Sequence, residues 1–320
     1  MISMKCKICG NSNDNIIFEI KEMTLEDGEF FEYMECSNCN CLQIIEIPQN
    51  MKKYYVNNYY YSFQEENRNT LEKIIIKKRN EYALFRKSYL GKFLFKKYPK
   101  EILYIIGNCK LKSSSRVLDV GCGSGNLLYS LENAGFKSLM GIDPYLEEEI
   151  ISANLKLIKK EFLYLNDKEK FDLIIFSHSL EHTNEHADIM HKIANLLNDN
   201  GHCIISMPLK TEYIWKLYGA NWVQIDAPRH FLIHSPKSFD ILIKKANLSI
   251  KSMCFNSNEF LFWGSEQNKK NIPIHSKNSY NINPEGSIYS KEQIKDYYNE
   301  ANRLNKECLG DQAIYILKKA

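Results

Sequence analysis

Four cysteines near the beginning of the sequence have the spacing of a metal site. Cys6 and Cys9 form one Cys-x-x-Cys pair, and Cys36 and Cys39 form a second. Two such pairs can complete a tetrahedral Zn²⁺ site, and four thiolates leave no open coordination position. The spacing therefore predicts a structural zinc ion, with a redox dithiol as the alternative. We expect the neighbouring Cys41 to be a packed apolar side chain rather than a fifth ligand.

A glycine-rich segment, VLDVGCGSG over residues 117–125, follows an apolar run in the middle of the chain. Its alternating glycines let the backbone turn sharply and approach a ligand closely where a strand gives way to a helix at Asn126. Asp119 can receive a donor such as the ammonium group of a methionine moiety. The spacing differs from the Gly-x-Gly-x-x-Gly of a dinucleotide phosphate loop. Asp143 ends the next predicted strand, where a carboxylate can accept hydrogen bonds from ribose hydroxyls. The alternative is a glycine turn without a cofactor.

Two histidines follow the predicted strand at 171–177 and are candidate bases. The carboxyl ends of parallel strands face the ligand crevice in this type of sheet. We expect His182 to be the general base, with His178 as the other candidate, because imidazole titrates in the range needed to deprotonate a hydroxyl. The alternative is that Glu181 and His182 cap and pack the following helix. His178, His182 and His186 share a four-residue spacing, but the chain there should be leaving a strand, so we expect no metal at these three histidines.

A second polar cluster surrounds Pro228. Trp222 offers a stacking surface, Asp226 a carboxylate, Arg229 a guanidinium that can grip phosphate, and His230 an imidazole. These four residues are candidate substrate contacts. The alternative is a loop that buries Trp222 and pairs Arg229 with Asp226.

These residues need a scaffold of alternating strands and helices. We predict strands at 116–120, 138–142, 155–158, 171–177, 202–206 and 248–255, and helices at 126–134, 145–153, 185–197 and 236–246. Such alternation is typical of βαβ units and a mainly parallel sheet. Residues 64–108 also read as helical, 265–290 as irregular, and 290–318 as a helix for packing or homodimer contact.

The segment that holds the glycine loop and the candidate histidines, roughly residues 113–208, resembles the class I S-adenosylmethionine-dependent methyltransferases. The matching stretches are Val117–Gly125, Gly141–Asp143, Phe171–Ser177, Ser179–His182 and Gly201–Pro208. The resemblance implies a Rossmann-like seven-stranded sheet with its last strand antiparallel, and S-adenosylmethionine as the cofactor. The cofactor contacts that it implies are Asp119, Gly121, Cys122, Gly123, Gly125, Asp143 and Ser177.

The flanking segments narrow this resemblance. Methyltransferases of capsule, O-antigen and deoxysugar pathways often join a zinc module to a tyrosine-rich link, and Cys39–Pro48 and Tyr54–Phe63 look similar. The implied function is methyl transfer to an oxygen or nitrogen of a small molecule, most simply a nucleotide-linked sugar or a capsule precursor. The domains expected are a zinc-binding module (1–50), a link with helices (51–110), the methyltransferase domain (111–260) and a C-terminal extension (261–320).

Composition limits the other functions. The 320 residues carry a formal net charge of +3, so no strong footprint for nucleic acid is present. The sequence shows neither a signal peptide nor an apolar run long enough for a membrane span, and we expect a cytoplasmic protein. An RNA methyltransferase with a zinc module is one alternative. A non-catalytic binding protein with a methyltransferase-like fold is another.

Overall fold

The fold is known from a computed structural model, which describes residues 5–25, 28–55 and 70–320. Part of the predicted tyrosine-rich link, with Tyr59, Tyr60 and Tyr61, lies outside the described residues. The chain forms two compact units. Unit 1 comprises Met1–Tyr59, His178–Met190 and Ile205–Ile316, and unit 2 comprises Tyr60–Ser177, His191–Ile204 and Leu317–Ala320.

The main sheet is eight-stranded, in the order β11-β12-β9-β8-β4-β5-β7-β6. Its bounds are β4 (Arg116–Val120), β5 (Ser138–Ile142), β6 (Ile150–Ile151), β7 (Leu155–Ile158), β8 (Phe171–Ser177), β9 (Leu197–Pro208), β11 (Leu248–Phe255) and β12 (Gln312–Lys319). β4 pairs in parallel with β5 and β8, and β5 with β7. The mainly parallel Rossmann-like sheet predicted for this segment is therefore present.

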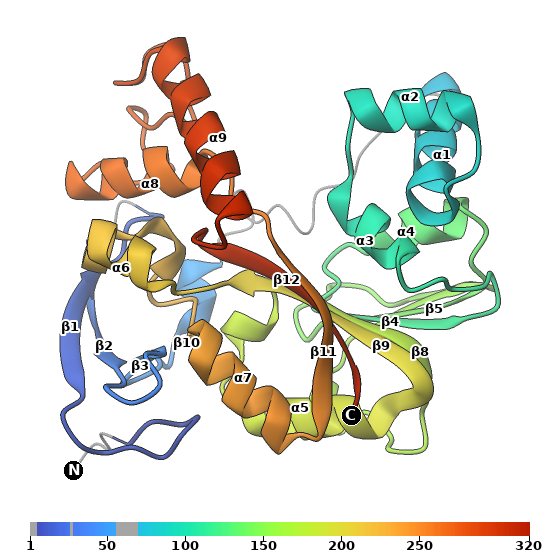
Figure 1. The fold of residues 1–320 in the computed structure, drawn as a ribbon, viewed down its shortest axis with the longest axis horizontal. Coiled ribbons are helices and arrows are strands. Elements are labelled where there is room, and N and C mark those ends of the chain that lie inside the picture. Colours follow the sequence, from blue (N-terminus) through green and yellow to red (C-terminus); the bar gives the residue numbers. More distant parts are fainter. Residues whose placement is uncertain (1–4, 26–27, 56–69) are drawn as a thin grey trace. The chain divides into compact units, whose positions relative to one another are not determined.

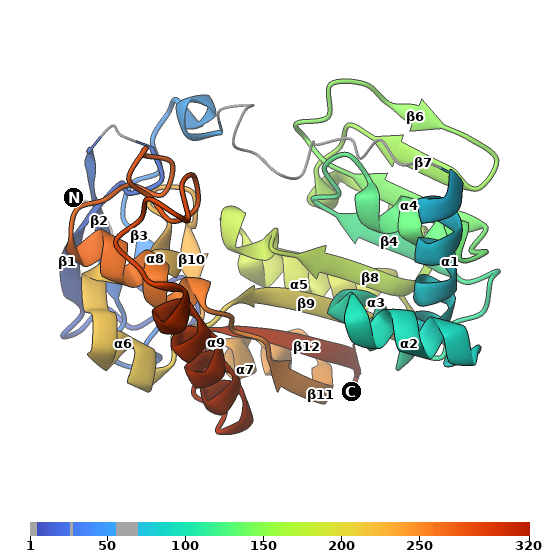
Figure 2. The same ribbon diagram turned by 90° about the horizontal axis from the view of Figure 1, so that it is seen from above.

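In unit 2 the strands carry the glycine loop at their carboxyl ends. The register aligns Asp119 of β4 with Gly141 of β5 and with Ile175 of β8. Figure 2 shows α4 (Asn126–Asn133) against these strands. Leu118, Leu139 and Ile174 are buried, as expected for strands that are covered on both faces. The other helices of unit 2 are α1 (Thr70–Phe85), α2 (Tyr89–Lys97) and α3 (Glu101–Gly107).

Two sequence predictions within the sheet are wrong. The helix predicted at 145–153 is absent, and Ile150–Ile151 form β6, which pairs antiparallel with β7. A tight turn allows this pairing, because the N–H of Ser152 donates to the carbonyl of Leu155 at 2.8 Å. The helix predicted over 290–318 ends at Lys306, and β12 follows between β11 and β9. The sheet therefore has more strands than the seven expected.

Unit 1 contains a second, four-stranded sheet in the order β1-β2-β3-β10 (Figure 1). The strands are β1 (Ile16–Lys21), β2 (Phe30–Glu35), β3 (Leu42–Ile44) and β10 (Leu232–Ile233). β10 pairs antiparallel with β3, so the residues just after His230 join the N-terminal strands. The cysteine-bearing segment is thus part of the same compact unit as residues 205–316.

Helices complete unit 1. They are α6 (Glu212–Tyr218), α7 (Pro236–Lys245), α8 (Phe260–Lys269) and α9 (Lys291–Lys306), while α5 (His186–Leu196) is divided between the two units. Short 3₁₀ turns lie at Met51–Tyr54, Phe162–Tyr164, Leu180–His182, Gly219–Asn221 and Val223–Ile225. α8 occupies part of the stretch expected to be irregular. The hydrophobic core joins Tyr33 of β2 to Trp222 and Leu261.

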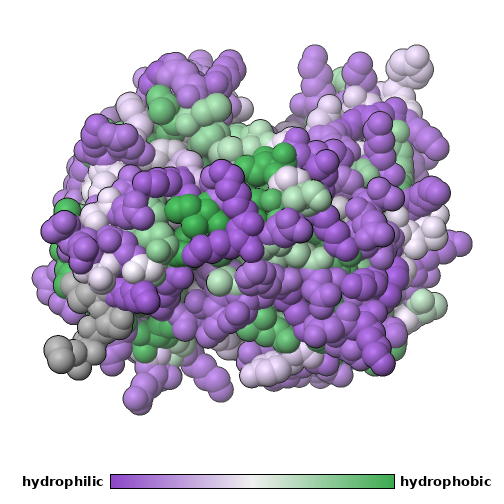
Figure 3. Space-filling view, turned by 60° about the horizontal axis from the view of Figure 1, so that its bottom comes forward, coloured by the Kyte–Doolittle hydropathy of each residue, from purple (hydrophilic) through white to green (hydrophobic). Residues whose placement is uncertain are grey.

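The face of the molecule drawn in Figure 3 is mostly hydrophilic, with patches of hydrophobic residues among the hydrophilic ones. Across the described residues, the helices all lack the combination of length and apolar content that a membrane span requires.

Candidate functional site

The glycine loop of unit 2 has the backbone that its sequence predicts. Gly121, Gly123 and Gly125 have φ values of 73°, 51° and 79°, a region that side chains with a Cβ rarely enter. A Cβ at Gly125 would lie 2.8 Å from the side chain of Leu157, so glycine is also required by space there. α4 begins directly after this loop, with Gly125 as its N-cap. The side chain of Cys122 is buried.

Asp143 braces this loop. Its Oδ2 accepts a hydrogen bond from the N–H of Gly123 at 3.0 Å, and its Oδ1 accepts one from the N–H of Tyr145 at 2.8 Å. Each carboxylate oxygen has a second lone pair, so both can still accept a bond from a ligand hydroxyl. The predicted ribose contact is therefore compatible with the bracing role.

Asp119 is buried at the end of β4, next to the loop. Burial, together with the nearby charge of Asp143, raises the pKa of its carboxyl to about 7. Burial also raises the pKa of Asp143, against the hydrogen bonds from Tyr145 and Gly123. Two buried carboxylates beside a glycine loop would be stabilised by a cationic ligand. The ammonium and sulfonium groups of S-adenosylmethionine supply such charge, so these residues fit that cofactor.

Ser177 is the last residue of β8, and His178 follows it as the first residue of the second segment of unit 1. The backbone of His178 has φ 52°, and its N–H donates to the carbonyl of Ser206 at 2.9 Å. Its Nε2 lies 3.2 Å from the Ser206 Oγ, and its Nδ1 lies 3.4 Å from Oε1 of Glu181. This turn therefore brings the imidazole of His178 close to both Ser206 and Glu181.

Glu181, His182 and His230 form a cluster in unit 1. One ligand atom from each lies within 4.8 Å of the others, and the two imidazole ring centroids are 4.8 Å apart. His182 Nδ1 lies 2.9 Å from the carbonyl oxygen of Arg229 and 3.1 Å from the Tyr55 hydroxyl. Two of the residues singled out in the sequence, His182 and His230, thus lie side by side, although Arg229, the residue before His230, is 47 positions after His182 in the sequence.

The electrostatics of this cluster keep Glu181 charged and His182 neutral at neutral pH. Burial alone would raise the pKa of Glu181, but His178, His230 and His182 lower it to about 2. Burial lowers the pKa of His182 to about 4, and the charge of His230 contributes in the same direction. A neutral imidazole can act as a base or as a metal ligand, so His182 is in the right protonation state for either role.

Asp226 and Arg229 form an ion pair beside the cluster, and both side chains are largely covered, with 16–17% of their surface exposed. Arg229 Nη2 lies 2.7 Å from Asp226 Oδ1, and the hydroxyl of Thr24 also donates to that oxygen at 2.7 Å. Burial opposes the charge on Asp226, yet Arg229 and His230 hold the pKa of that carboxyl well below its usual range. His230 Nε2 lies 3.7 Å from Asp226 Oδ2.

Trp222 does not join these residues. It is 1% exposed and packs in the hydrophobic core of unit 1. Its indole N–H donates to Oδ2 of Asp311 at 3.1 Å. His186 is also apart from the cluster, because its Nδ1 lies 2.9 Å from Nε2 of His234.

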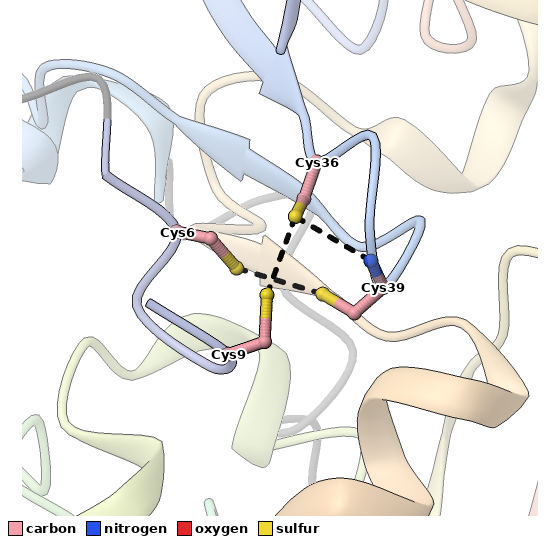
Figure 4. A group of neighbouring side chains, drawn as sticks. All are labelled: Cys6, Cys9, Cys36 and Cys39. Carbon is pink, nitrogen blue, oxygen red and sulfur yellow. Dashed lines mark hydrogen bonds between the residues drawn. The ribbon is translucent and has the colours of Figure 1, made fainter. Parts of the chain in front are cut away.

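The four N-terminal cysteines converge as their spacing predicts (Figure 4). Their Sγ atoms lie within 4.8 Å of one another, with Cys6 and Cys39 at 3.5 Å and Cys9 and Cys36 at 3.4 Å. Gly10 and Asn40, which follow the two pairs, have φ values of 79° and 60°, as metal knuckles require. Four thiol ligands with this spacing fit a tetrahedral Zn²⁺ ion.

Sequence reasoning missed three residues of this region: Tyr55, which contacts His182, Thr24, which contacts the ion pair, and Glu22, which bonds the backbone of Thr24. Glu22 is buried, and its Oε1 accepts bonds from the N–H groups of Thr24 and Leu25, both at 2.7 Å. Burial raises the pKa of Glu22 to about 7. No local pattern marks these residues, since Thr24 and Asp226 are 202 positions apart.

Comparison with known proteins gives consistent matches. A family model described as "Methyltransferase domain" matches residues 90–252, about half of the chain. The ubiquinone biosynthesis O-methyltransferase of Pelagibacter ubique is 30% identical over 177 residues, which are 49% of this chain and 72% of that protein. Its counterpart from Hydrogenovibrio crunogenus is 28% identical over 153 residues, 42% of this chain and 62% of that protein. A solved S-adenosylmethionine-dependent methyltransferase from Archaeoglobus fulgidus aligns with a TM-score of 0.42 and 20% identity, covering 75% of this chain and 97% of that one.

Proposed function

The chain belongs to the class I S-adenosylmethionine-dependent methyltransferases, and from this premise we propose that it methylates an oxygen atom of a small-molecule acceptor. Oxygen is favoured over nitrogen because the similar curated proteins are named O-methyltransferases. The alternative of a non-catalytic binding protein is therefore abandoned.

The observation that carries the proposal is the braced glycine loop with its two buried carboxylates. We assign S-adenosylmethionine to Asp119, Gly121, Cys122, Gly123, Gly125, Asp143 and Ser177. Asp119 would face the ammonium group of the cofactor, and Asp143 the ribose hydroxyls. The raised pKa of Asp119 supports this assignment, because a cation bound there would stabilise its ionised form.

In the reaction the acceptor oxygen attacks the methyl carbon, and the carbon–sulfur bond breaks with its electron pair moving to sulfur. The hydroxyl proton must also leave. We assign this proton to Nε2 of His182. A carbonyl can only accept, so the contact with Arg229 places a hydrogen on Nδ1 and leaves the lone pair on Nε2. His178 is the second candidate base.

Two acceptor classes follow from different observations. The resemblance of the flanking cysteine pairs and tyrosine-rich stretch to capsule and deoxysugar-pathway methyltransferases favours a sugar linked to a nucleotide or lipid, and we retain this as the first hypothesis. The names of the relatives favour a precursor in ubiquinone biosynthesis. For either class we assign Asp226, Arg229 and His230 as residues that position the acceptor. RNA remains the third candidate, disfavoured by the low net charge.

We also propose that Cys6, Cys9, Cys36 and Cys39 hold a structural zinc ion. Its role would be to stabilise the N-terminal part of unit 1, which contributes Thr24 and Tyr55 to the surroundings of His182 and Arg229.

The test uses purified protein and methyl-labelled S-adenosylmethionine. Nucleotide sugars, ubiquinone-type phenol precursors and undermethylated RNA are offered separately. Label in an alkali-stable ether of either small-molecule class, lost in His182→Ala while cofactor affinity persists, supports the proposal. Label in RNA alone, or on nitrogen alone, contradicts it.

A further inference from the structure

The cluster of Glu181, His182 and His230 has the composition of a metal site, although no metal was expected at the histidines of this segment. We propose that these three residues bind a divalent first-row transition metal ion. Their ligand atoms already lie within 4.8 Å of one another. Two imidazole nitrogens and one carboxylate form a donor set that suits Mn²⁺, Fe²⁺, Co²⁺ or Zn²⁺.

Both imidazoles are fixed with a lone pair available for a metal. His230 Nδ1 lies 2.8 Å from the carbonyl oxygen of Gln224, and His182 Nδ1 lies 2.9 Å from that of Arg229. Because a carbonyl only accepts, each Nδ1 carries a hydrogen, so in the neutral ring Nε2 is the nitrogen that holds the lone pair. A backbone carbonyl that fixes the tautomer in this way is typical of metal-ligating histidines.

The carboxylate of Glu181, unlike the two imidazoles, has no close hydrogen-bond partner among the described residues. Its side chain is 2% exposed, and neither oxygen accepts a hydrogen bond from the described part of the chain. The nearest basic group, His178 Nδ1, is 3.4 Å from Oε1 and belongs to a side chain that is 44% exposed. A buried carboxylate of this kind costs several kcal/mol unless a cation compensates it.

The neighbouring charges do not supply that cation. The guanidinium of Arg229 is paired with Asp226, and the hydroxyl of Thr24 bonds the same carboxylate oxygen. The two charges of this ion pair cancel, so Glu181 contributes an uncompensated negative charge. A dication on Nε2 of both histidines and on Glu181 would neutralise it.

Three protein ligands leave coordination positions open. This step rests on the proposed function: the hydroxyl oxygen of the acceptor would occupy an open position on the metal. The metal would lower the pKa of that hydroxyl, so its proton would pass to water more readily. His182 would then act as a ligand, and the metal would perform the task assigned above to its lone pair.

The test is a titration with Mn²⁺ alone, followed by electron paramagnetic resonance, because free and bound Mn²⁺ give different signals. The full chain is first dialysed briefly against EDTA. Thiolate sites select zinc over Mn²⁺, so the cysteine site does not compete. We expect one Mn²⁺ per chain and a dissociation constant that rises at least about tenfold in Glu181→Gln and in His230→Ala, by loss of one ligand. His186→Gln, a change at a buried histidine outside the cluster, should leave it unchanged.

Circular dichroism and cofactor affinity verify that each variant is folded. Absence of stoichiometric Mn²⁺ binding, or equal binding in wild type and both ligand variants, overturns the metal site. The outcome is separable from the proposed function. O-methylation by a protein that fails to bind Mn²⁺ removes the metal proposal alone, whereas Mn²⁺ binding without O-methylation of any acceptor removes the function alone.

Discussion

The backbone N–H of Gly123 donates to Oδ2 of Asp143 across 3.0 Å, so the residue assigned to the ribose also fixes the loop assigned to the methionine part. Two contacts with the cofactor would therefore depend on one carboxylate. This coupling makes Asp143 the most informative position in unit 2.

Replacing Asp143 with alanine should weaken S-adenosylmethionine binding by about 10- to 100-fold. The change removes bonds to a charged acceptor that are each worth about 1.5–3 kcal/mol. Isothermal titration calorimetry measures the effect, and Glu148→Ala, at an exposed carboxylate nearby, is the matched control. Equal affinities in both variants would show that the loop does not need this brace.

Cofactor affinity should depend on pH through Asp119. Its pKa is raised to about 7 by burial and by Asp143, so its charged form in the free protein is present mainly above that pH. An ammonium group binds the ionised carboxylate, so affinity should fall by up to about tenfold per unit as the pH decreases below 7. Calorimetry between pH 5.5 and 8.5 tests this. In Asp119→Asn the binding should be weaker and the dependence flatter, whereas a flat profile in the wild type would exclude the ammonium contact.

The raised pKa of Asp119 also predicts how the stability of the fold changes with pH. A carboxyl with a folded-state pKa above its unfolded value destabilises the fold once it ionises. The free protein therefore loses stability from Asp119 as the pH rises from about 4 towards 7. Bound cofactor should offset this loss, so the gain in Tm on adding S-adenosylmethionine should be larger at pH 8 than at pH 6.

Zinc content should distinguish Cys36 from Cys41. Mass spectrometry of the metals in Cys36→Ala should show loss of zinc, with a Tm lower by several degrees, because structural zinc contributes directly to folding. Cys41 is equally buried, with its Sγ 3.5 Å from those of Cys6 and Cys39, yet Cys41→Ala should retain the metal. Zinc loss in both variants would make Cys41 a ligand.

Two ion pairs, one largely covered and one exposed, should differ in how much stability is lost when each is broken. Asp226→Asn leaves the Arg229 guanidinium buried without its counter-charge and should lower the free energy of unfolding by about 3–5 kcal/mol. Asp240→Asn breaks an exposed pair with Lys244 and should cost less than about 1 kcal/mol. Urea denaturation gives both values. Similar small losses would mean that the fold relaxes to hydrate Arg229.

The parallel strands of unit 2 could be predicted because each has a local signal. β4, β5, β7 and β8 are short apolar runs that end at a glycine or polar turn. β12 lacked such a signal, since six of its residues in succession are buried and no alternation separates a strand from a buried helix. The helix predicted over 145–153 failed because pairing with β7 outweighed the helix propensity of the glutamates.

The glycine loop of unit 2 and the polar cluster of unit 1 also differ in how far local sequence could predict them. The glycine loop and Asp143 lie within one βαβ unit, so their roles could be inferred from spacing. Trp222 and Arg229 belong to one sequence cluster, but the fold buries the first in the core and places the second beside Thr24. A linear motif cannot distinguish these outcomes, because they depend on segments about 200 positions away.

The position of β12 between β11 and β9 has a consequence for biosynthesis. Those two neighbours are made well before residues 312–319, so on a translating ribosome their facing edges have no strand to pair with. Unpaired strand edges promote association between chains. The nascent protein would therefore be exposed to aggregation until β12 emerges, and a nonsense mutation just before Gln312 would leave that hazard permanent.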